Sequence, residues 1–300
     1  MSDKKTEKEP VVLTNFIELP KSSKRAFIVT INRPNQLNAF NTDVCHSLAN
    51  IFHSLAKYFH EQSSGNDGND GEYEDVVAVI LTGRGKSFCA GADLSNPPNP
   101  LDQSSELEHH LRINPVFQMD SLRIPIIAAI RGHCITGGFE LALACDILVG
   151  DTTSKFRDTH VKFNVAPCWG LSQKLQRKIG YGRASLVSYT AQFINANQAF
   201  QWGLLDEIVG VDDNVSSSSS ISLDVKRAIE IADDIGMNDN LMVQRYKNAL
   251  KQGGKMDLEK GLQRERQLGM AHYLRVMDDG KTMDGAREFI TNETRPRSKL

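Results

Sequence analysis

The pattern of apolar positions divides the first part of the chain into short strands and helices. Two strands, "FIELP" and "AFIVTINRP", are expected around the polar turn "KSSKR". Three further stretches, "VVAVILTG", "IPIIAAIRG" and "CDILVGD", are apolar at nearly every position, which is typical of strands in a sheet covered on both faces. Between them, "NTDVCHSLANIFHSLAKYFHEQ" has apolar residues at helical spacing. Strands that alternate with helices predict an α/β core with parallel pairing.

The second half of the chain is richer in helix. The stretch "GRASLVSYTAQFINANQAFQWGLLDEIVG" predicts helix, turn, helix and then a short strand, and amphipathic helix dominates from Val225 onward. Polar, Gly-rich and Ser-rich segments mark the expected boundaries between these parts. The predicted organisation is a mobile tail 1–10, a core 11–212 with a flexible insert 62–74, a Ser-rich linker 213–224, a helical region 225–297 and a final tripeptide 298–300.

Composition excludes several classes of function. Hydrophobic residues make up 40% of the 300 residues and charged residues 24%, as in ordinary globular proteins. The net charge of -2 gives no reason to expect a nucleic-acid partner. We expect no membrane span, because no apolar run reaches about 18 residues. The five cysteines show no CxxC spacing, so free thiols in a reducing compartment are expected and a metal site is not.

One acidic residue stands in an apolar setting. Glu140 lies in the first turn of the helix predicted within "TGGFELALACD", which is apolar on every side. An ionised carboxylate there is costly unless another group pairs with it or a reaction uses it. An apolar pocket raises the pKa of a carboxyl group and suits it to carry protons near neutral pH. A favourable helix dipole explains the position of Glu140 but not its apolar surroundings, so Glu140 is the first candidate catalytic residue.

Five motifs in order carry a resemblance to a known family. They are "NRPNQLNAF", "GKSFCAGADL", "IRGHCITGGFELALACD", "APCWGLSQKLQRKIG" and "AFQWGLLDEIV". From about residue 11 to the last helices, the chain resembles the enoyl-CoA hydratase/isomerase family, the crotonases. The version "DTH…APCWGLSQKL" is most similar to peroxisomal monofunctional enoyl-CoA hydratases. The resemblance implies an α/β fold, a spiral of ββα units with a helical C-terminal region that serves in oligomerisation or as a lid.

The resemblance also implies a set of site residues. Two backbone N–H groups, those of Ala92 and Gly137, are expected to stabilise the negative charge that builds on a thioester oxygen, each donor contributing about 3 kcal/mol. Glycines and a helix N-terminus suit both motifs to this task. The expected coenzyme A contacts are Asn38, Ala39, Ala90, Asp93 and Leu94. No separate cofactor is expected, because coenzyme A is part of the acyl-CoA thioester substrate.

The chain departs from the family at the second catalytic position. Standard hydratases have a second glutamate twenty residues after the first, whereas "FRDTH" places His160 there. Two interpretations remain open: His160 carries a proton, or it only orients Glu140 or a water molecule. Asp158 shares a face with His160 only if that stretch is extended. Trp169, in "APCWG", is a second departure, and it either narrows the acyl tunnel or packs in the core.

The function expected from the resemblance is hydration of a trans-2-enoyl-CoA to a 3-hydroxyacyl-CoA in fatty acid β-oxidation, with Glu140 activating the water. The alternatives are double-bond isomerisation or thioester hydrolysis on the same scaffold, and a catalytically silent binding protein. The acyl chain length is not expected to follow from the sequence. A homotrimer or hexamer is implied by the family. The final tripeptide, Ser298, Lys299 and Leu300, predicts a peroxisomal location through an import receptor.

Overall fold

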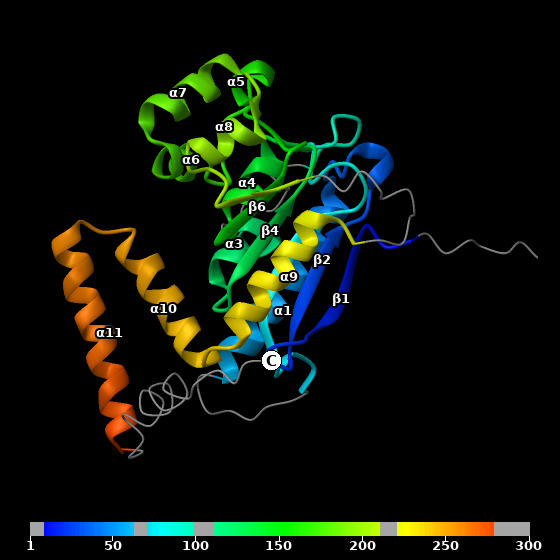
Figure 1. The fold of residues 1–300 in the computed structure, drawn as a ribbon. Coiled ribbons are helices and arrows are strands. Elements are labelled where there is room, and N and C mark those ends of the chain that lie inside the picture. The colour runs from blue at the N-terminus through cyan, green and yellow to red at the C-terminus, as the bar shows by residue number, and fades with distance from the viewer. Residues whose placement is uncertain (1–8, 63–70, 99–110, 211–220, 279–300) are drawn as a thin grey trace, which may run out of the picture. The chain divides into compact units, whose positions relative to one another are not determined.

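A computed structural model describes residues 9–62, 71–98, 111–210 and 221–278 (Figure 1). Most of the predicted tail, insert and linker, and the whole final tripeptide, lie outside these ranges, as does the end of the predicted helical region. The chain divides into two compact units, Met1–Val243 and Gln244–Leu300. This division lies after the boundary that the sequence predicted at residue 225.

A six-stranded sheet forms the centre of the first unit. Its order is β1-β2-β3-β4-β6-β9, with β1 and β2 antiparallel and every later pair parallel. The expected strands are confirmed, and so is the α/β class. The bounds are β1 Val12–Leu19, β2 Lys24–Ile31, β3 Val76–Gly83, β4 Ile126–Ile130, β6 Ile147–Asp151 and β9 Glu207–Val209.

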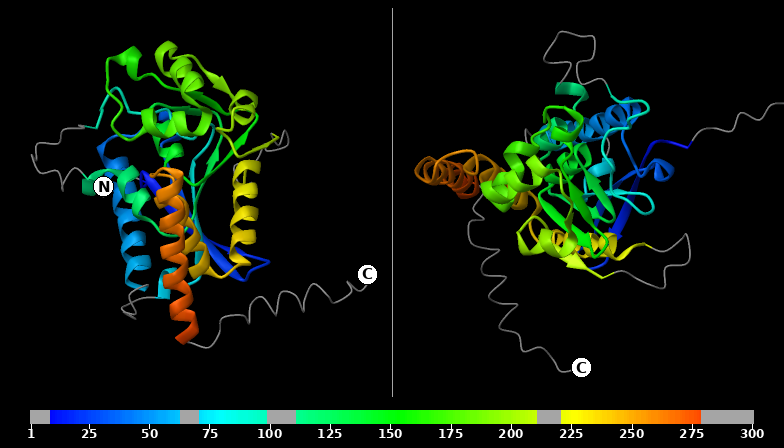
Figure 2. Two further views of the ribbon diagram at one scale, coloured as in Figure 1. Left: turned by 90° about the vertical axis from the view of Figure 1, so that its left-hand side faces the viewer. Right: turned by 90° about the horizontal axis from the view of Figure 1, so that it is seen from above.

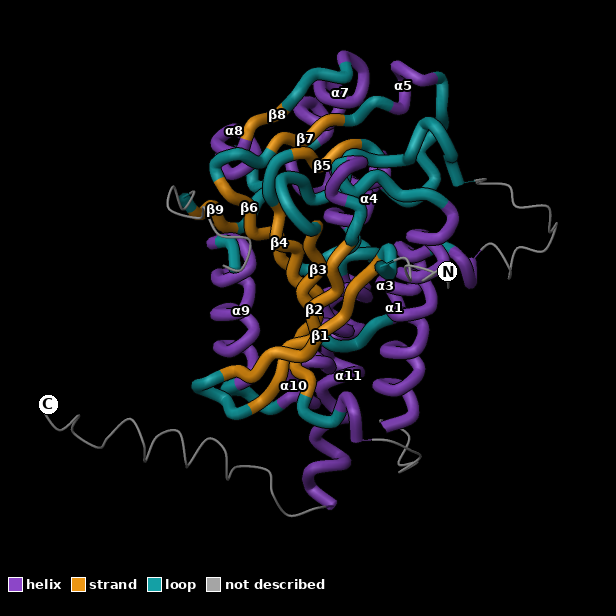
Figure 3. Tube along the Cα trace, turned by 90° about the vertical axis from the view of Figure 1, so that its right-hand side faces the viewer, coloured by secondary structure: helices purple, strands orange, loops and turns teal. Residues whose placement is uncertain are grey.

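Helices cover both faces of this sheet. Helix α9 (Leu223–Gly236) lies along one face, while α1 (Thr42–Gln62) and α3 (Pro115–Ser121) lie on the other side (Figure 3). Every residue of β3 is buried, which is why its sequence is continuously apolar. Helix α9 begins two residues before its predicted start at Val225. It packs on the sheet through an apolar stripe, so it belongs to the core unit.

A second, smaller sheet and several short helices lie beyond one end of the large sheet (Figures 2 and 3). Strand β7 of this sheet pairs with β5 in parallel and with β8 antiparallel. Strand β5 leads directly into α4, the helix that carries Glu140. The bounds are β5 His133–Ile135, β7 Lys155–Arg157, β8 Ile194–Asn195, α4 Gly137–Leu143, α5 His160–Phe163, α6 Leu171–Ile179, α7 Tyr181–Thr190 and α8 Ala196–Gln201, with 3-10 turns η1 Pro34–Gln36 and η2 Gly71–Tyr73.

The second unit consists, in its described part, of most of α10 (Asn240–Gly253) and of α11 (Leu258–Asp278). The Arg264 guanidinium donates a hydrogen bond to the Gln252 side chain and so ties the two helices together. Several large apolar side chains on them are exposed: Tyr246, Leu250, Leu258, Leu262, Met270, Tyr273 and Leu274. The trimer or hexamer expected from the family stays a prediction. Within the described ranges, no helix combines the length and apolar character that crossing a bilayer requires.

Candidate active site

The two glycine motifs meet at the N-terminus of α4. Cys89 pairs with Cys134 of β5 through an isolated bridge, and the Ile135 N–H donates to the Cys89 carbonyl at 3.0 Å. Gly138 then lies so close to this loop that an added Cβ would be 2.3 Å from the Cys89 carbonyl oxygen. Only a residue without a side chain permits this approach. The structure therefore brings "CAGAD" and "TGGFE" together, as the sequence predicted.

This close approach gives a stability prediction. Gly138→Ala should lower the free energy of unfolding by about 1–3 kcal/mol, because the new methyl group forces the loop and α4 apart. The control is Gly182→Ala in α7, where an added Cβ meets no atom within 4 Å. That control should be neutral or slightly stabilising, since alanine is the better helix former. Urea denaturation of both variants makes the measurement, and equal midpoints for the two would contradict the packing described.

The two expected oxyanion donors share a neighbour, Phe40. The Phe40 backbone pairs with Ala92, and its ring lies over Gly137, where an added Cβ would be 2.3 Å from the Phe40 Cζ. In the described part of the chain, the N–H groups of Ala92 and Gly137 donate no hydrogen bond. Their role as oxyanion donors stays a prediction. The Trp169 ring stacks on the Phe40 ring, with the two ring centroids 5.0 Å apart.

The residue before the first of these helix glycines is strained. Thr136 has φ 48° and ψ −107°, a conformation that a β-branched residue rarely adopts. Its backbone N–H donates to the Arg157 carbonyl at 2.8 Å, and its hydroxyl accepts from the Thr159 N–H at 3.1 Å and contacts the Thr159 hydroxyl. This clamp fixes the start of α4 against the segment that leads into His160.

Glu140 lies within the site with only 3% of its surface exposed. Its Oε1 accepts two hydrogen bonds, from the N–H groups of Trp169 at 3.0 Å and Leu171 at 3.2 Å, just where α6 begins. Burial raises the pKa of Glu140 above its ordinary value, although these two hydrogen bonds and the charge of His160 oppose the rise. The carboxylate is thus held by one oxygen, and Oε2 remains for chemistry.

His160 faces that second oxygen. Its Nε2 lies 3.9 Å from Glu140 Oε2, too far for a direct hydrogen bond. Its Nδ1 lies 2.7 Å from Asp158 Oδ1, which also accepts the His160 backbone N–H at 3.0 Å. The two residues meet because α5 begins at His160 and not because the stretch is extended, so the strand geometry considered from the sequence is wrong here.

The acidic neighbours determine the protonation of His160. Burial by itself lowers the pKa of a histidine, but the hydrogen bond to Asp158 and the charges of Glu140 and Asp158 outweigh it, so the pKa of His160 is raised. For Asp158, burial is likewise outweighed, here by hydrogen bonds from His160 and Ser188, and its pKa is lowered. Asp158 and Glu140 on either side of the ring therefore favour the charged, imidazolium form of His160.

The residues expected to contact coenzyme A lie on the loops beside the site, and their side chains differ in exposure. Asn38 is fully buried, and its amide donates to the Arg84 and Ser87 carbonyls, so its side chain holds the loop together. Asp93 forms an ion pair with Arg33 at 2.8 Å. Leu94 is 71% exposed, whereas Ala39 is buried and Ala90 half-buried. Coenzyme A contacts by these residues stay a prediction.

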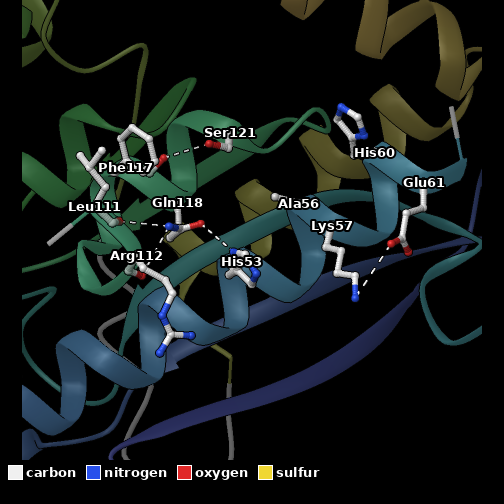
Figure 4. Close-up of a pocket in the computed structure, with 10 residues that line it drawn as sticks. All are labelled: His53, Ala56, Lys57, His60, Glu61, Leu111, Arg112, Phe117, Gln118 and Ser121. Carbon is white, nitrogen blue, oxygen red and sulfur yellow. Dashed lines mark hydrogen bonds and ion pairs between the residues drawn. The ribbon is translucent and has the colours of Figure 1, made fainter. Parts of the chain in front are cut away.

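A pocket of about 570 Å³ lies elsewhere in the first unit (Figure 4). It is formed by one side of α1, the residues before α3 and α3 itself. None of the predicted site residues lines it. The described residues contain no group of three or more His, Cys, Asp or Glu side chains suited to hold a metal ion.

Comparisons with known proteins find relatives over most of the chain. The sequence profile of the family described as enoyl-CoA hydratase/isomerase matches residues 22–290. A probable peroxisomal enoyl-CoA hydratase 1 of Arabidopsis thaliana is 37% identical over 297 residues, 97% of this chain and 100% of that protein. A short-chain-enoyl-CoA hydratase of Clostridium acetobutylicum is 33% identical, covering 83% of this chain and 85% of that protein.

A solved structure shares the fold. The crystal structure of an enoyl-CoA hydratase from Bacillus anthracis superposes with a TM-score of 0.74 at 29% sequence identity. The match covers 94% of this chain and 96% of that one. Together with the family profile, this similarity confirms the predicted crotonase-type fold.

Proposed function

The chain belongs to the enoyl-CoA hydratase/isomerase family, and on that basis we propose that it adds water to a trans-2-enoyl-CoA to give a 3-hydroxyacyl-CoA. One observation carries the proposal: Glu140 Oε2 and His160 Nε2 face each other at 3.9 Å. Glu140 lies on α4, and the N–H of Gly137 at the start of this helix donates to no acceptor among the described residues. A base, an acid and an oxyanion donor are what addition of water to an enoyl thioester requires. The proposed reaction is the hydration step of fatty acid β-oxidation.

Glu140 acts as the base. The 3.9 Å between Glu140 Oε2 and His160 Nε2 is shorter than two hydrogen bonds of about 2.8 Å placed end to end. One water oxygen can therefore lie within hydrogen-bonding distance of both atoms. Glu140 Oε2 takes a proton from this water as its oxygen forms a bond to the β-carbon. The N–H groups of Trp169 and Leu171 keep Oε1 in place, so the carboxylate does not rotate during the transfer.

His160 acts as the acid. As the C–O bond forms, the electron pair of the double bond moves toward the thioester carbonyl, whose oxygen is stabilised by the N–H groups of Ala92 and Gly137. The α-carbon then takes the proton from His160 Nε2. Return of the proton from Glu140 to His160 restores the starting state. The sum is addition of one water molecule, and it needs no cofactor besides the coenzyme A of the substrate.

Activity assays with two substrates, a trans-2-enoyl-CoA and a 3-enoyl-CoA, test this proposal. Mixing the protein with a trans-2-enoyl-CoA should remove the absorbance of the conjugated thioester and yield the 3-hydroxyacyl-CoA. A 3-enoyl-CoA should be converted much more slowly, because the chain lacks a carboxylate at position 160. Faster conversion of the 3-enoyl-CoA would favour an isomerase, release of free coenzyme A a thioester hydrolase, and no reaction with either substrate a binding protein. A series of acyl chain lengths in the same assay determines the substrate preference.

The proposed location is the peroxisome. Its supports are the sequence Ser298-Lys299-Leu300 and the name of the Arabidopsis thaliana relative. A fluorescent protein fused before residue 1 should appear in punctate peroxisomes, and deletion of residues 298–300 should move it to the cytosol while leaving turnover intact. A truncated fusion that stays punctate would remove the case for this signal.

A further inference from the structure

We propose that Asp158 is the positioning residue that makes His160 a working acid, by fixing its tautomer and keeping it charged. This role rests on the proposed function of His160. The family position holds a carboxylic acid, which carries its own proton at a low cost of desolvation. A buried histidine lacks that advantage, because burial removes the solvation of the imidazolium. Asp158 compensates through its hydrogen bond and its charge, and the charge of Glu140 adds to the effect.

The geometry fixes the orientation of the imidazole ring. Asp158 Oδ1 accepts both the backbone N–H of His160 at 3.0 Å and the ring Nδ1–H at 2.7 Å. The two contacts anchor the main chain and the side chain of His160 to one atom. Nδ1 is thereby kept as a donor, and Nε2 is the nitrogen directed at Glu140. Both Asp158 and His160 are about 95% or more buried, at 3% and 5% exposure, so water does not compete for these bonds.

The surrounding elements determine the local charge. Glu140 on α4 faces the ring, and Ser188 on α7 donates a hydrogen bond to Asp158. The thiol of Cys168 lies near Glu140, and burial raises its pKa, so it stays neutral. The Arg157 guanidinium is directed away, to the Ala191 carbonyl and the Phe193 ring. Asp158 and Glu140 are therefore the charges that hold the proton on His160.

Asp158 provides a constant negative charge beside His160, a task that Glu140 cannot perform while it also transfers a proton. Glu140 must gain and lose a proton in each turnover, so its charge is absent for part of the cycle. Asp158 has a lowered pKa and keeps its charge throughout. His160 therefore retains one permanent anionic partner on Nδ1 while it gives and regains the proton on Nε2.

The test is Asp158→Asn, with Asp151→Asn as the matched control. Asp151 is another buried carboxylate at 7% exposure, and it accepts from the Thr153 N–H in the same way as Asp158 accepts from His160. In Asp158→Asn the pKa of His160 should fall, so the basic limb of kcat/KM should move to lower pH. Activity above that limb should drop roughly ten-fold for each unit that the pKa falls. In Asp151→Asn the limb should not move.

A second readout does not depend on turnover. NMR titration of histidine-labelled protein gives the pKa and tautomer of His160, identified by the signal that His160→Gln removes. Asp158→Asn should lower that pKa and allow the other tautomer to appear. An unchanged pKa and an unmoved limb in folded Asp158→Asn would overturn this role. If wild-type protein shows no hydration, or His160→Gln keeps the basic limb, it is the proposed function that fails.

Discussion

Glu140→Gln should lower kcat for hydration by roughly 100-fold or more, since general acid–base catalysis typically contributes 10²–10⁴-fold. The substitution keeps the shape of the side chain and removes the base. The amide oxygen of Gln can still accept the N–H groups of Trp169 and Leu171, so the position of α6 should not change. Binding of the thioester should be nearly unchanged. Steady-state kinetics with a trans-2-enoyl-CoA, together with binding of a non-reactive acyl-CoA, makes the comparison.

The matched control is Glu207→Gln. Glu207 pairs with Arg227 at 2.6 Å and lies away from the site, on β9. This variant tests whether removing any ion-paired glutamate lowers kcat for hydration. The kcat of Glu207→Gln should equal that of the wild type. Retention of more than about half of the activity in Glu140→Gln would remove Glu140 from the mechanism.

His160→Gln should also lower kcat by roughly 100-fold, because it removes the proton donor to the α-carbon. His160→Glu restores the pair of carboxylates typical of the family and should recover much of the activity, with added isomerisation of 3-enoyl-CoA. The rival interpretation is that Glu140 handles both ends of the water and His160 only orients it. In that case His160→Gln slows hydration only modestly, and His160→Glu brings no recovery.

The central strands and the long helices of this fold were predictable from the sequence. Strand β3 is read directly from "VVAVILTG", because burial on both faces leaves every position apolar. The small sheet β5-β7-β8 was not predicted, since its strands have only two or three residues and show no periodicity. The boundary at 225 differs because the apolar stripe of α9 packs on a sheet formed far earlier in the chain. Amphipathic spacing alone does not say which surface a helix covers.

Some features of the site could likewise be predicted from the sequence, and others could not. Glu140 was recognisable, because a charged residue in an apolar stretch is conspicuous. The groups that hold it were not, since the N–H groups of Trp169 and Leu171 are backbone atoms and have no side-chain signature. The sequence did show a glycine, Gly170, between these two residues. In the structure Gly170 has a positive φ of 104°, as a tight turn at this point requires. The contact between Asp158 and His160 depends on where α5 begins, which propensity does not fix within a residue or two.

The pH dependence of kcat/KM for the wild type and His160→Gln, measured side by side, tests the central claim most directly. In the wild type the rate should rise as Glu140 loses its proton, above the ordinary carboxyl range because burial raises that pKa. It should fall again as His160 loses its proton, above the ordinary histidine range because Asp158 and Glu140 outweigh burial. The account predicts a bell-shaped profile whose basic limb is absent in His160→Gln. A basic limb of unchanged position in His160→Gln would contradict it, because the histidine would then not be the acid.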